Sequence, residues 1–203
     1  MGIKERKERE QEDLQQKILD AASELFAKDG YESVSMRKIA DKIEYSPTTI
    51  YLYFKDKNDL LNQICEETFA NLIKDWQKIE DKADEPIVSL KKSMQAYVEF
   101  GLKYPNHYEV TFTNPIMEFL GESGLPFEGS MGQKAFENLS LQVAKSMEAG
   151  QIKQNDVAVV SQLIWAMGHG IVSLLNSHKD FPFVEKDTLI EGSIDMIFNG
   201  IKN

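Results

Sequence analysis

The sequence predicts an all-α protein, and three observations carry this prediction. Its six prolines leave long proline-free stretches in which apolar residues recur at three- and four-residue steps. No segment shows the apolar and polar alternation of a half-buried strand. Of the 203 residues, 42% are hydrophobic and 28% are charged, so a sizeable core is possible and a disordered chain is excluded. The length suits one small and one medium domain.

The first helix is predicted to end at Gly30, because a glycine after Lys28 and Asp29 is a typical helix stop. Glutamates alternate with the basic residues of the first dozen positions, so we expect a solvated helical extension there rather than a nucleic-acid-binding arm. The apolar positions that define the helix share one face: Leu14, Ile18, Leu19, Ala22, Leu25 and Phe26.

Two short helices are predicted next, with Ser35 and Ser46 as their N-caps and Pro47 in the first turn of the second. Two helices of about eight residues joined by a tight turn have the proportions of a helix-turn-helix, whose second helix enters the major groove. Ile50 and Phe54 are predicted to point inward. The opposite side carries Tyr51, although the faces alone leave open whether Tyr51 and Tyr53 simply complete a small core.

A long helix is predicted from Asp56, whose carboxylate can cap the next turn, to about Lys82. The following segments have helical periodicity as well, and a glycine-rich loop is predicted over residues 121–132. These further helices are predicted at residues 87–103, 106–120, 132–149, 156–177 and 185–201.

The charge distribution confines any nucleic-acid binding to one region. The net charge of the chain is -10, from 23 Lys and Arg against 33 Asp and Glu. The window from Ser35 to Lys57 holds five basic and three acidic residues, so it is locally positive while the rest of the chain is strongly negative. The positive charge therefore coincides with the two short helices.

Several functions are not supported. The single cysteine, Cys65, cannot form an internal disulfide, and the three histidines lack metal-ligand spacing, so we expect neither a metal site nor a cofactor. No nucleophile elbow or phosphate loop is present, so an enzyme is possible but unsupported. A helical adaptor that binds a protein partner is the other alternative. The charged start and the expected lack of a bilayer-spanning run predict a cytoplasmic protein without a membrane partner.

Several motifs, which together cover about the first quarter of the chain, resemble the N-terminal domain of tetracycline-repressor (TetR) family regulators. They are the segments 18–26 (ILDAASELF), 30–31 (GY), 35–40 (SMRKIA) and 46–61 (SPTTIYLYFKDKNDLL). Two residues depart from the pattern, since Glu44 in the turn and Thr48 in the recognition helix stand where glycine is common. Either the turn therefore has another geometry, or it is left-handed and stores strain at Glu44.

The resemblance implies a ligand-responsive transcriptional repressor that binds a palindromic operator as a homodimer and releases it when a small lipophilic effector binds. It implies a DNA-binding domain over residues 1–57 and a ligand-binding and dimerisation domain over 58–203. Arg37 is expected to reach a phosphate or guanine, Leu52 a thymine methyl, and the tyrosines phosphates. The predicted DNA contacts are Arg37, Ser46, Pro47, Thr48, Thr49, Tyr51, Leu52, Tyr53 and Lys57.

The helix predicted at 156–177 is apolar nearly all round, so it must be covered on two sides. Its Trp165 and His169-Gly170 also resemble a pattern of one C-terminal-domain subgroup of the family. We expect this helix and the last one to form a two-fold four-helix dimer interface, with burial inside a monomer as the alternative. The predicted interface residues are Ile164, Met167, Ile171, Leu174, Ile190, Ile194, Ile197 and Ile201.

Aromatic and sulfur-containing residues are concentrated between Tyr97 and Trp165, and a cavity lined by them would hold a lipophilic effector. For His169, packing between helices is an alternative to ligand contact. The predicted ligand contacts are Tyr97, Phe100, Tyr104, Tyr108, Phe112, Asn114, Phe136, Trp165 and His169.

Overall fold

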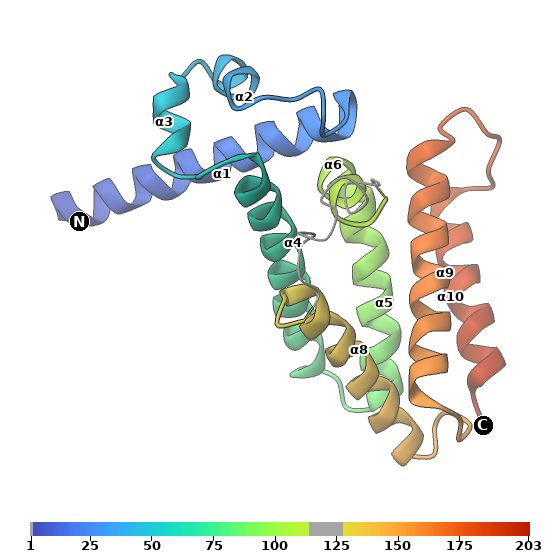
Figure 1. Cartoon of the computed structure of the whole chain (residues 1–203). Coiled ribbons are helices and arrows are strands. Elements are labelled where there is room, and N and C mark those ends of the chain that lie inside the picture. Colours follow the sequence, from blue (N-terminus) through green and yellow to red (C-terminus); the bar gives the residue numbers. More distant parts are fainter. Residues whose placement is uncertain (1, 114–127) are drawn as a thin grey trace. The chain divides into compact units, whose positions relative to one another are not determined.

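A computed structural model describes residues 2–113 and 128–203 of the chain, and it confirms the all-α fold class (Figure 1). The only β-type pairing within those two ranges is an isolated antiparallel bridge between Ile152 and Lys202. The elements are α1 (Ile3–Asp29), α2 (Met36–Ile43), α3 (Pro47–Tyr51), α4 (Lys57–Glu80), α5 (Pro86–Lys103), α6 (Pro105–Tyr108), the π-helical turn η1 (Glu109–Thr113), α8 (Met131–Glu148), α9 (Val157–Ser177) and α10 (Lys186–Ile201).

The chain forms two compact units, and each has its own core. The first unit contains residues 1–68 and 106–126, and the second contains residues 69–105 and 127–203. The domain boundary predicted at residue 57 falls at the start of α4, whereas the packing of the first unit continues to Thr68 and includes the segment that begins at Asn106. The functions expected of the two domains stay predictions.

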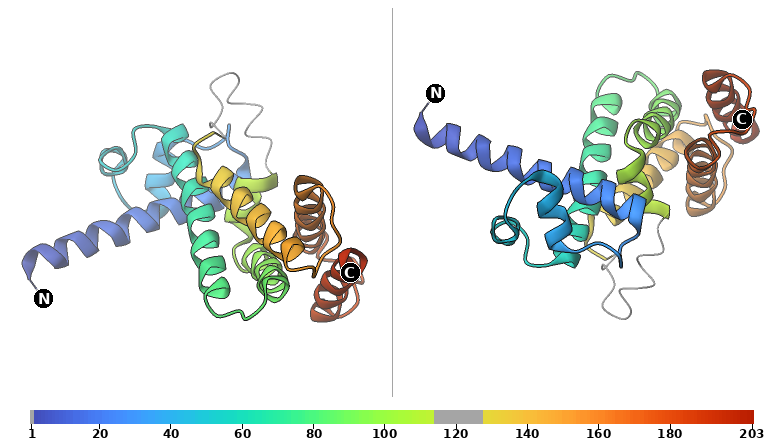
Figure 2. Two further views of the ribbon diagram at one scale, coloured as in Figure 1. Left: turned by 90° about the horizontal axis from the view of Figure 1, so that it is seen from below. Right: turned by 90° about the horizontal axis from the view of Figure 1, so that it is seen from above.

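In the first unit, α1, α2, α3 and the first part of α4 enclose a core that includes the fully buried Phe26, Ile39 and Ile50. Helix α1 ends at Gly30, whose φ of 78° is easily adopted only by glycine, as the sequence predicted. The predicted helical extension is also present. Its first turns are exposed, extend beyond α3 (Figure 2), and carry ion pairs one turn apart, such as Arg6 with Glu10 at 2.8 Å.

In the second unit, α5 packs against α8, α9 and α10 (Figures 1 and 2). A buried polar group at this centre is satisfied: Trp76 Nε1 donates to the Ser93 carbonyl at 2.8 Å. Helix α9 approaches α5 closely at Gly168, where an added Cβ would lie 2.4 Å from Met94 Sδ. A side chain at this position would therefore have to displace Met94 from its place in the packing.

The segment after α5 differs from the predicted helix over 106–120. A four-residue α-helix, α6, is followed by the π-helical turn η1, and residues 114–127, which include most of the predicted glycine-rich loop, lie outside the described part. The turn packs on α1, with Val110 in the core of the first unit. The sequence gives no local signal for a π-helical turn, because its extra residue per turn is selected by packing rather than by propensity.

Helix α9 corrects the expectation that the chain contains no apolar run long enough to span a bilayer. With 21 residues and a mean hydropathy of 1.6, it is long and apolar enough to cross a membrane by length and composition alone. A core helix of a soluble protein meets the same criteria, and α9 packs against α5, α8 and α10. One such helix among the described residues is weak evidence for a membrane segment.

Candidate nucleic-acid interface

The two short helices are held by the caps that the sequence predicted. Ser35 Oγ accepts a hydrogen bond from the Lys38 backbone N–H at 3.2 Å, and Ser46 Oγ accepts one from the Thr49 N–H at 3.2 Å. The Thr49 hydroxyl also lies 2.9 Å from Ser46 Oγ. Together with Pro47 in the first turn, these bonds fix the start and the direction of α3.

The turn between α2 and α3 has the left-handed geometry that glycine usually provides. Glu44 has φ 62° and ψ 39°, and no other non-glycine residue in the described ranges has a positive φ. The Tyr45 N–H donates to the Ala40 carbonyl at 3.0 Å, which closes the end of α2. Of the two possibilities left by the sequence, the turn therefore keeps its geometry and stores about 1 kcal/mol of strain at Glu44.

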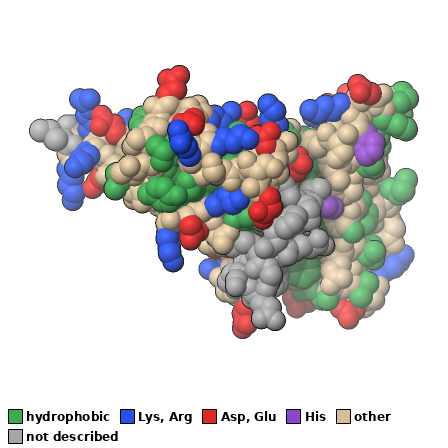
Figure 3. All heavy atoms as spheres, turned by 45° about the horizontal axis from the view of Figure 1, so that its top comes forward, with side chains coloured by type: hydrophobic (Ala, Val, Ile, Leu, Met, Phe, Trp, Pro, Cys, Tyr) green, Lys and Arg blue, Asp and Glu red, His purple; other side chains and the backbone are tan. Residues whose placement is uncertain are grey.

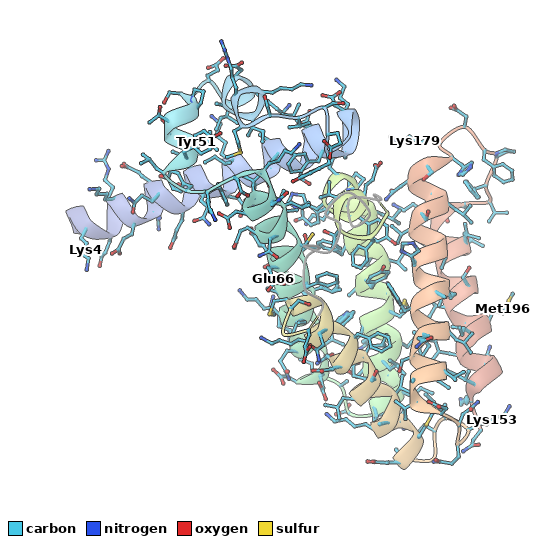
Figure 4. The ribbon with its side chains drawn as sticks, in the orientation of Figure 1. Lys4, Tyr51, Glu66, Lys153, Lys179 and Met196 are labelled. Carbon is cyan, nitrogen blue, oxygen red and sulfur yellow. The ribbon has the colours of Figure 1, made fainter. Side chains whose placement is uncertain are left out.

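Helix α3 buries one side and exposes an apolar opposite side. Ile50 and Phe54 are 0% and 3% exposed, whereas Tyr51 and Leu52 are 54% and 79% exposed. Tyr53 packs partly against the core. The alternative that the two tyrosines complete a small core therefore holds for Tyr53 only. Tyr51 lies on the exposed side of α3 (Figure 4).

Basic side chains surround this surface, but several have partners inside the first unit. Lys38 pairs with Asp29 and Lys42 pairs with Glu24, both at 2.8 Å. Arg37 and Lys55 are exposed and have no side-chain ion pair or hydrogen bond with described residues. Figure 3 shows a hydrophobic area on the first unit with Lys and Arg side chains around it. The arrangement suits a polyanion that also presents apolar groups.

Lys57 points toward the protein at the start of α4. Its Nζ donates to the Tyr31 carbonyl at 2.7 Å and lies 4.0 Å from the centre of the Tyr31 ring. Burial, and then the charges of Asp56 and Glu32, raises the pKa of Tyr31 to about 12, so its hydroxyl stays protonated. The predicted phosphate contact by Lys57 would use its remaining ammonium protons.

The predicted cap of α4 is confirmed. Asp56 Oδ1 accepts a hydrogen bond from the Asp59 N–H at 2.9 Å, and Asp59 Oδ2 accepts one from the Lys55 N–H at 2.9 Å. These reciprocal bonds order the chain between α3 and α4. The segment from Tyr51 to Lys55, which carries the exposed Tyr51 and Leu52, is therefore fixed at both ends.

Four of the residues predicted to contact an effector form a cluster in the second unit. Trp165 Nε1 donates to the Tyr97 hydroxyl at 3.3 Å, and the Trp165 ring lies 6.3 Å from that of Phe136 and 6.2 Å from that of His169. Burial lowers the pKa of His169, which favours the neutral imidazole at physiological pH. The cluster is aromatic with a few polar atoms, which is the kind of lining that lipophilic ligands contact.

The other predicted ligand residues are distributed elsewhere. The rings of Phe100 and Tyr104 lie against each other at the end of α5, with their centres 5.4 Å apart and their planes tilted by 41°. Tyr108 and Phe112 belong to the first unit and stack at 4.9 Å. Asn114 lies outside the described residues.

A groove that the sequence did not indicate lies between α5 and α10 and has a volume of about 330 Å³. Three carboxylates and two lysines line it, so it does not fit a lipophilic effector. Its lining residues are Gln95, Glu99, Leu102, Lys103, Lys186, Asp187, Ile190 and Glu191.

The residues predicted for a dimer interface divide into two groups. Ile164, Ile171, Ile190 and Ile194 are buried within the second unit, so they belong to the core of one chain and not to its surface. This is a correction for those four positions, because an all-apolar helix does not reveal which side its own chain covers. Met167, Ile197 and Ile201 are partly exposed, and Leu174 is 49% exposed.

An apolar stripe remains exposed along α9 and α10. It consists of Val159, Leu163 and Leu174 on α9 and Met196, which is 78% exposed and extends away from α10 (Figure 4). Three glycines on the same helices are open, since an added Cβ would meet nothing within 4 Å. They are Gly170, Gly192 and Gly200. Sequence periodicity did not single out Val159, Leu163 and Met196, because the regularly spaced isoleucines define a different face of these helices.

Comparison with known proteins gives consistent results for both parts of the chain. Residues 18–64 match the family described as bacterial regulatory proteins, tetR family, and residues 90–197, more than half of the chain, match the tetracyclin repressor-like C-terminal domain. The fatty acid metabolism regulator protein of Bacillus subtilis is 26% identical over 191 residues, which cover 92% of this chain and 94% of that protein.

Solved structures have the same fold over nearly the whole chain. A tetR-family regulatory protein from Rhodococcus RHA1 has a TM-score of 0.78 at 18% identity, covering 93% of this chain and 96% of that one. FadR from Bacillus subtilis in complex with stearoyl-CoA has a TM-score of 0.75 at 22% identity, covering 92% and 98%. The relatives are named as transcriptional regulators and not as enzymes. With both domain models matched in order, the chain belongs to the tetR family of bacterial regulatory proteins.

Proposed function

We propose that this regulator is a cytoplasmic repressor that binds a palindromic operator as a homodimer and is released by a small lipophilic effector. The observation that carries the proposal is the helix-turn-helix, in which the capped helix α3 exposes Thr48, Tyr51 and Leu52 beside the unpaired Arg37 and Lys55. A surface of this kind fits a major groove and its flanking phosphates. Residues 1–57 would bind DNA and residues 58–203 would bind effector and partner.

The exposed stripe on α9 and α10 supports the homodimer. Large apolar side chains on two adjacent helices, with open glycines between them, allow two helices of a second copy to approach closely. A two-fold axis through this stripe would pair the surface with itself and present two α3 helices to one duplex. Half-sites about 34–36 Å apart, one turn of B-DNA, would then be read together.

The aromatic cluster around Trp165 supports a lipophilic effector. The Bacillus subtilis relative is named for fatty acid metabolism, and the FadR structure contains stearoyl-CoA. We therefore propose an effector with a long acyl chain, held against Tyr97, Phe136, Trp165 and His169. Trp165 and His169 lie side by side, which also supports the C-terminal subgroup with this Trp and His-Gly pattern.

Selection of bound fragments from a sheared genomic library at physiological salt tests the DNA-binding proposal. Enrichment of a palindrome is expected. Adding stearoyl-CoA should then release the enriched fragment, whereas coenzyme A alone should not. No enrichment by a folded protein would instead favour the adaptor alternative.

Replacing Tyr51 by alanine tests the role of the exposed side of α3. Loss of one charge-assisted hydrogen bond to a phosphate in each subunit of the dimer should weaken operator binding about 100-fold, while the thermal unfolding temperature stays close to that of the parent. Fluorescence anisotropy with labelled operator measures the affinity. Phe181→Ala, which removes a similarly exposed aromatic side chain from the segment between α9 and α10, is the matched control. Equal affinity of the Tyr51 variant and the parent would refute the contact.

A further inference from the structure

We propose that α3 reads its operator mainly through the methyl groups of thymines, with Leu52 as the principal contact. The proposal rests on the DNA-binding function proposed above and specifies what the surface recognises. The methyl group at C5 of thymine is the apolar group that base pairs present in the major groove. A duplex in which uracil replaces thymine lacks only that group.

The recognition helix lacks the side chains that usually read bases by paired hydrogen bonds. Arginine or lysine reads guanine and asparagine or glutamine reads adenine, but the segment from Pro47 to Leu52 (PTTIYL) contains none of these residues, and no carboxylate. Of its hydroxyl groups, that of Thr49 is bonded to Ser46 Oγ within the cap. Thr48 and Tyr51 are left as the polar groups on the exposed side.

The neighbouring basic side chains contribute little to the recognition of individual bases. Lys38 and Lys42 are held by carboxylates of α1, each at 2.8 Å. Arg37 is the one guanidinium in the helix-turn-helix, and it lies at the start of α2 rather than on α3. Polar discrimination between base pairs is therefore limited to a few groups, whereas apolar contact area is plentiful.

Leu52 is the apolar side chain of this surface that would gain most from being buried on binding. It is 79% exposed and directly follows Tyr51, which is 54% exposed. Its place after the last residue of α3 is fixed by the backbone bonds of Leu52 and Phe54 to Thr49 and Ile50, at 3.2 and 3.0 Å. The positive surroundings of this tip favour a nucleic acid over an apolar protein surface.

The expected effect follows from the transfer of one methyl group out of water. Such a transfer changes an equilibrium constant about fourfold, so losing one symmetric pair of methyls from a two-fold site should cost about fifteenfold in affinity. Phosphate contacts are unchanged by uracil. The loss should therefore be the same at low and high salt.

The experiment uses the full-length protein and the operator obtained by fragment selection, with uracil replacing one symmetric pair of thymines at a time. A loss of about fifteenfold at one pair or more is expected. In Leu52→Ala, the thymine operator should bind more weakly and the difference between thymine and uracil at that pair should disappear. Leu141→Ala, which truncates an exposed leucine of α8, should keep the full difference.

Three results would overturn the proposal at different levels. Losses below about twofold at every pair, with the thymine operator still bound, would overturn methyl readout and leave DNA binding intact. An unchanged thymine-to-uracil ratio in Leu52→Ala would overturn the assignment to Leu52. If no duplex were bound at all, the proposed function would fail, and this inference would fail with it.

Discussion

The two units of the molecule expose apolar side chains in different patterns. In the first unit, Tyr51 and Leu52 form a small tip at the end of α3, and lysines and an arginine surround it. In the second unit, Val159, Leu163 and Leu174 follow the length of α9, next to glycines that leave the surface open. The first pattern is a small apolar tip near basic side chains, and the second is a set of apolar residues spread along one helix.

This difference indicates what each surface can bind. An apolar tip among cations matches a groove in which methyl groups alternate with phosphates. A stripe two helices wide, with small residues in it, matches helices that pack at close range. The apolar content alone would not have distinguished the two surfaces, whereas its distribution does.

The largest effect should come from placing one carboxylate on each surface. Leu163→Asp would bury an unpaired charge in the proposed dimer, so its dissociation constant should rise by more than about 100-fold. Leu52→Asp should leave the dimer intact and abolish operator binding. Sedimentation velocity and anisotropy measure the two effects. A stable dimer of Leu163→Asp would remove the distinction between the surfaces.

The next effect concerns two glycines of α9 that have opposite surroundings. In Gly168→Ala, the new Cβ would lie 2.4 Å from Met94 Sδ and 3.3 Å from Tyr97 Cδ1, so the free energy of unfolding should fall by about 1–3 kcal/mol. Gly170→Ala, with open space around it, should not destabilise the single chain. Urea denaturation measures both. The penalty at position 168 should shrink in a Met94→Ala background, and an unchanged penalty would contradict the assigned clash.

A smaller effect is expected at the strained turn of the first unit. Glu44→Gly should relieve about 1 kcal/mol of left-handed strain, reduced by the greater chain entropy of glycine, for a net stabilisation below about 1 kcal/mol. Glu44→Ala keeps a Cβ and should give no such gain. If both variants had the same unfolding free energy, the strain would not be at the Glu44 backbone.

The smallest effect is a pH dependence in the first unit. Burial raises the pKa of Glu67, although the nearby His107 opposes this shift. A carboxyl whose folded pKa is raised destabilises the fold above that pKa, and this contribution disappears as pH falls toward the unfolded value. Glu67→Gln should therefore gain most over the parent near pH 7–8 and lose this advantage toward pH 4.5. The gain is small because Glu67 is only half-buried.

Denaturation of both proteins across this pH range measures the difference. A constant difference, or one that grows as the pH falls, would contradict the assigned shift. In the second unit, His169 offers a comparison for Glu67, because burial lowers the pKa of His169. Burial disfavours the charged form in both residues, so the two shifts have opposite directions.

Much of the fold could be predicted because its signals are local. Ser35, Ser46 and Asp56 cap the helices that the sequence assigned to them, and Gly30 ends α1. Each of these choices depends on hydrogen bonds between residues three or four positions apart. The helix-turn-helix could be recognised for the same reason, whereas the exposure of Tyr51 was decided only by the structure.

The candidate sites were less predictable because their geometry depends on distant residues. The pairing of Lys42 with Glu24 joins positions 18 residues apart, and that of Trp165 with Tyr97 joins positions 68 apart. Neither partner can be chosen from periodicity. The groove between α5 and α10 and the π-helical turn after α6 gave no sequence signal for the same reason.

The sequence by itself determined where most of the helices begin and end, which face of each amphipathic helix is apolar, and that the positive charge lies at the two short helices. Only the tertiary structure decided which side of the all-apolar α9 is buried, so that Ile164 and Ile171 face the core while Leu163 and Leu174 remain exposed. Helix formation is governed by neighbours within one turn, whereas the choice of a buried side depends on the close packing of elements far apart in the chain.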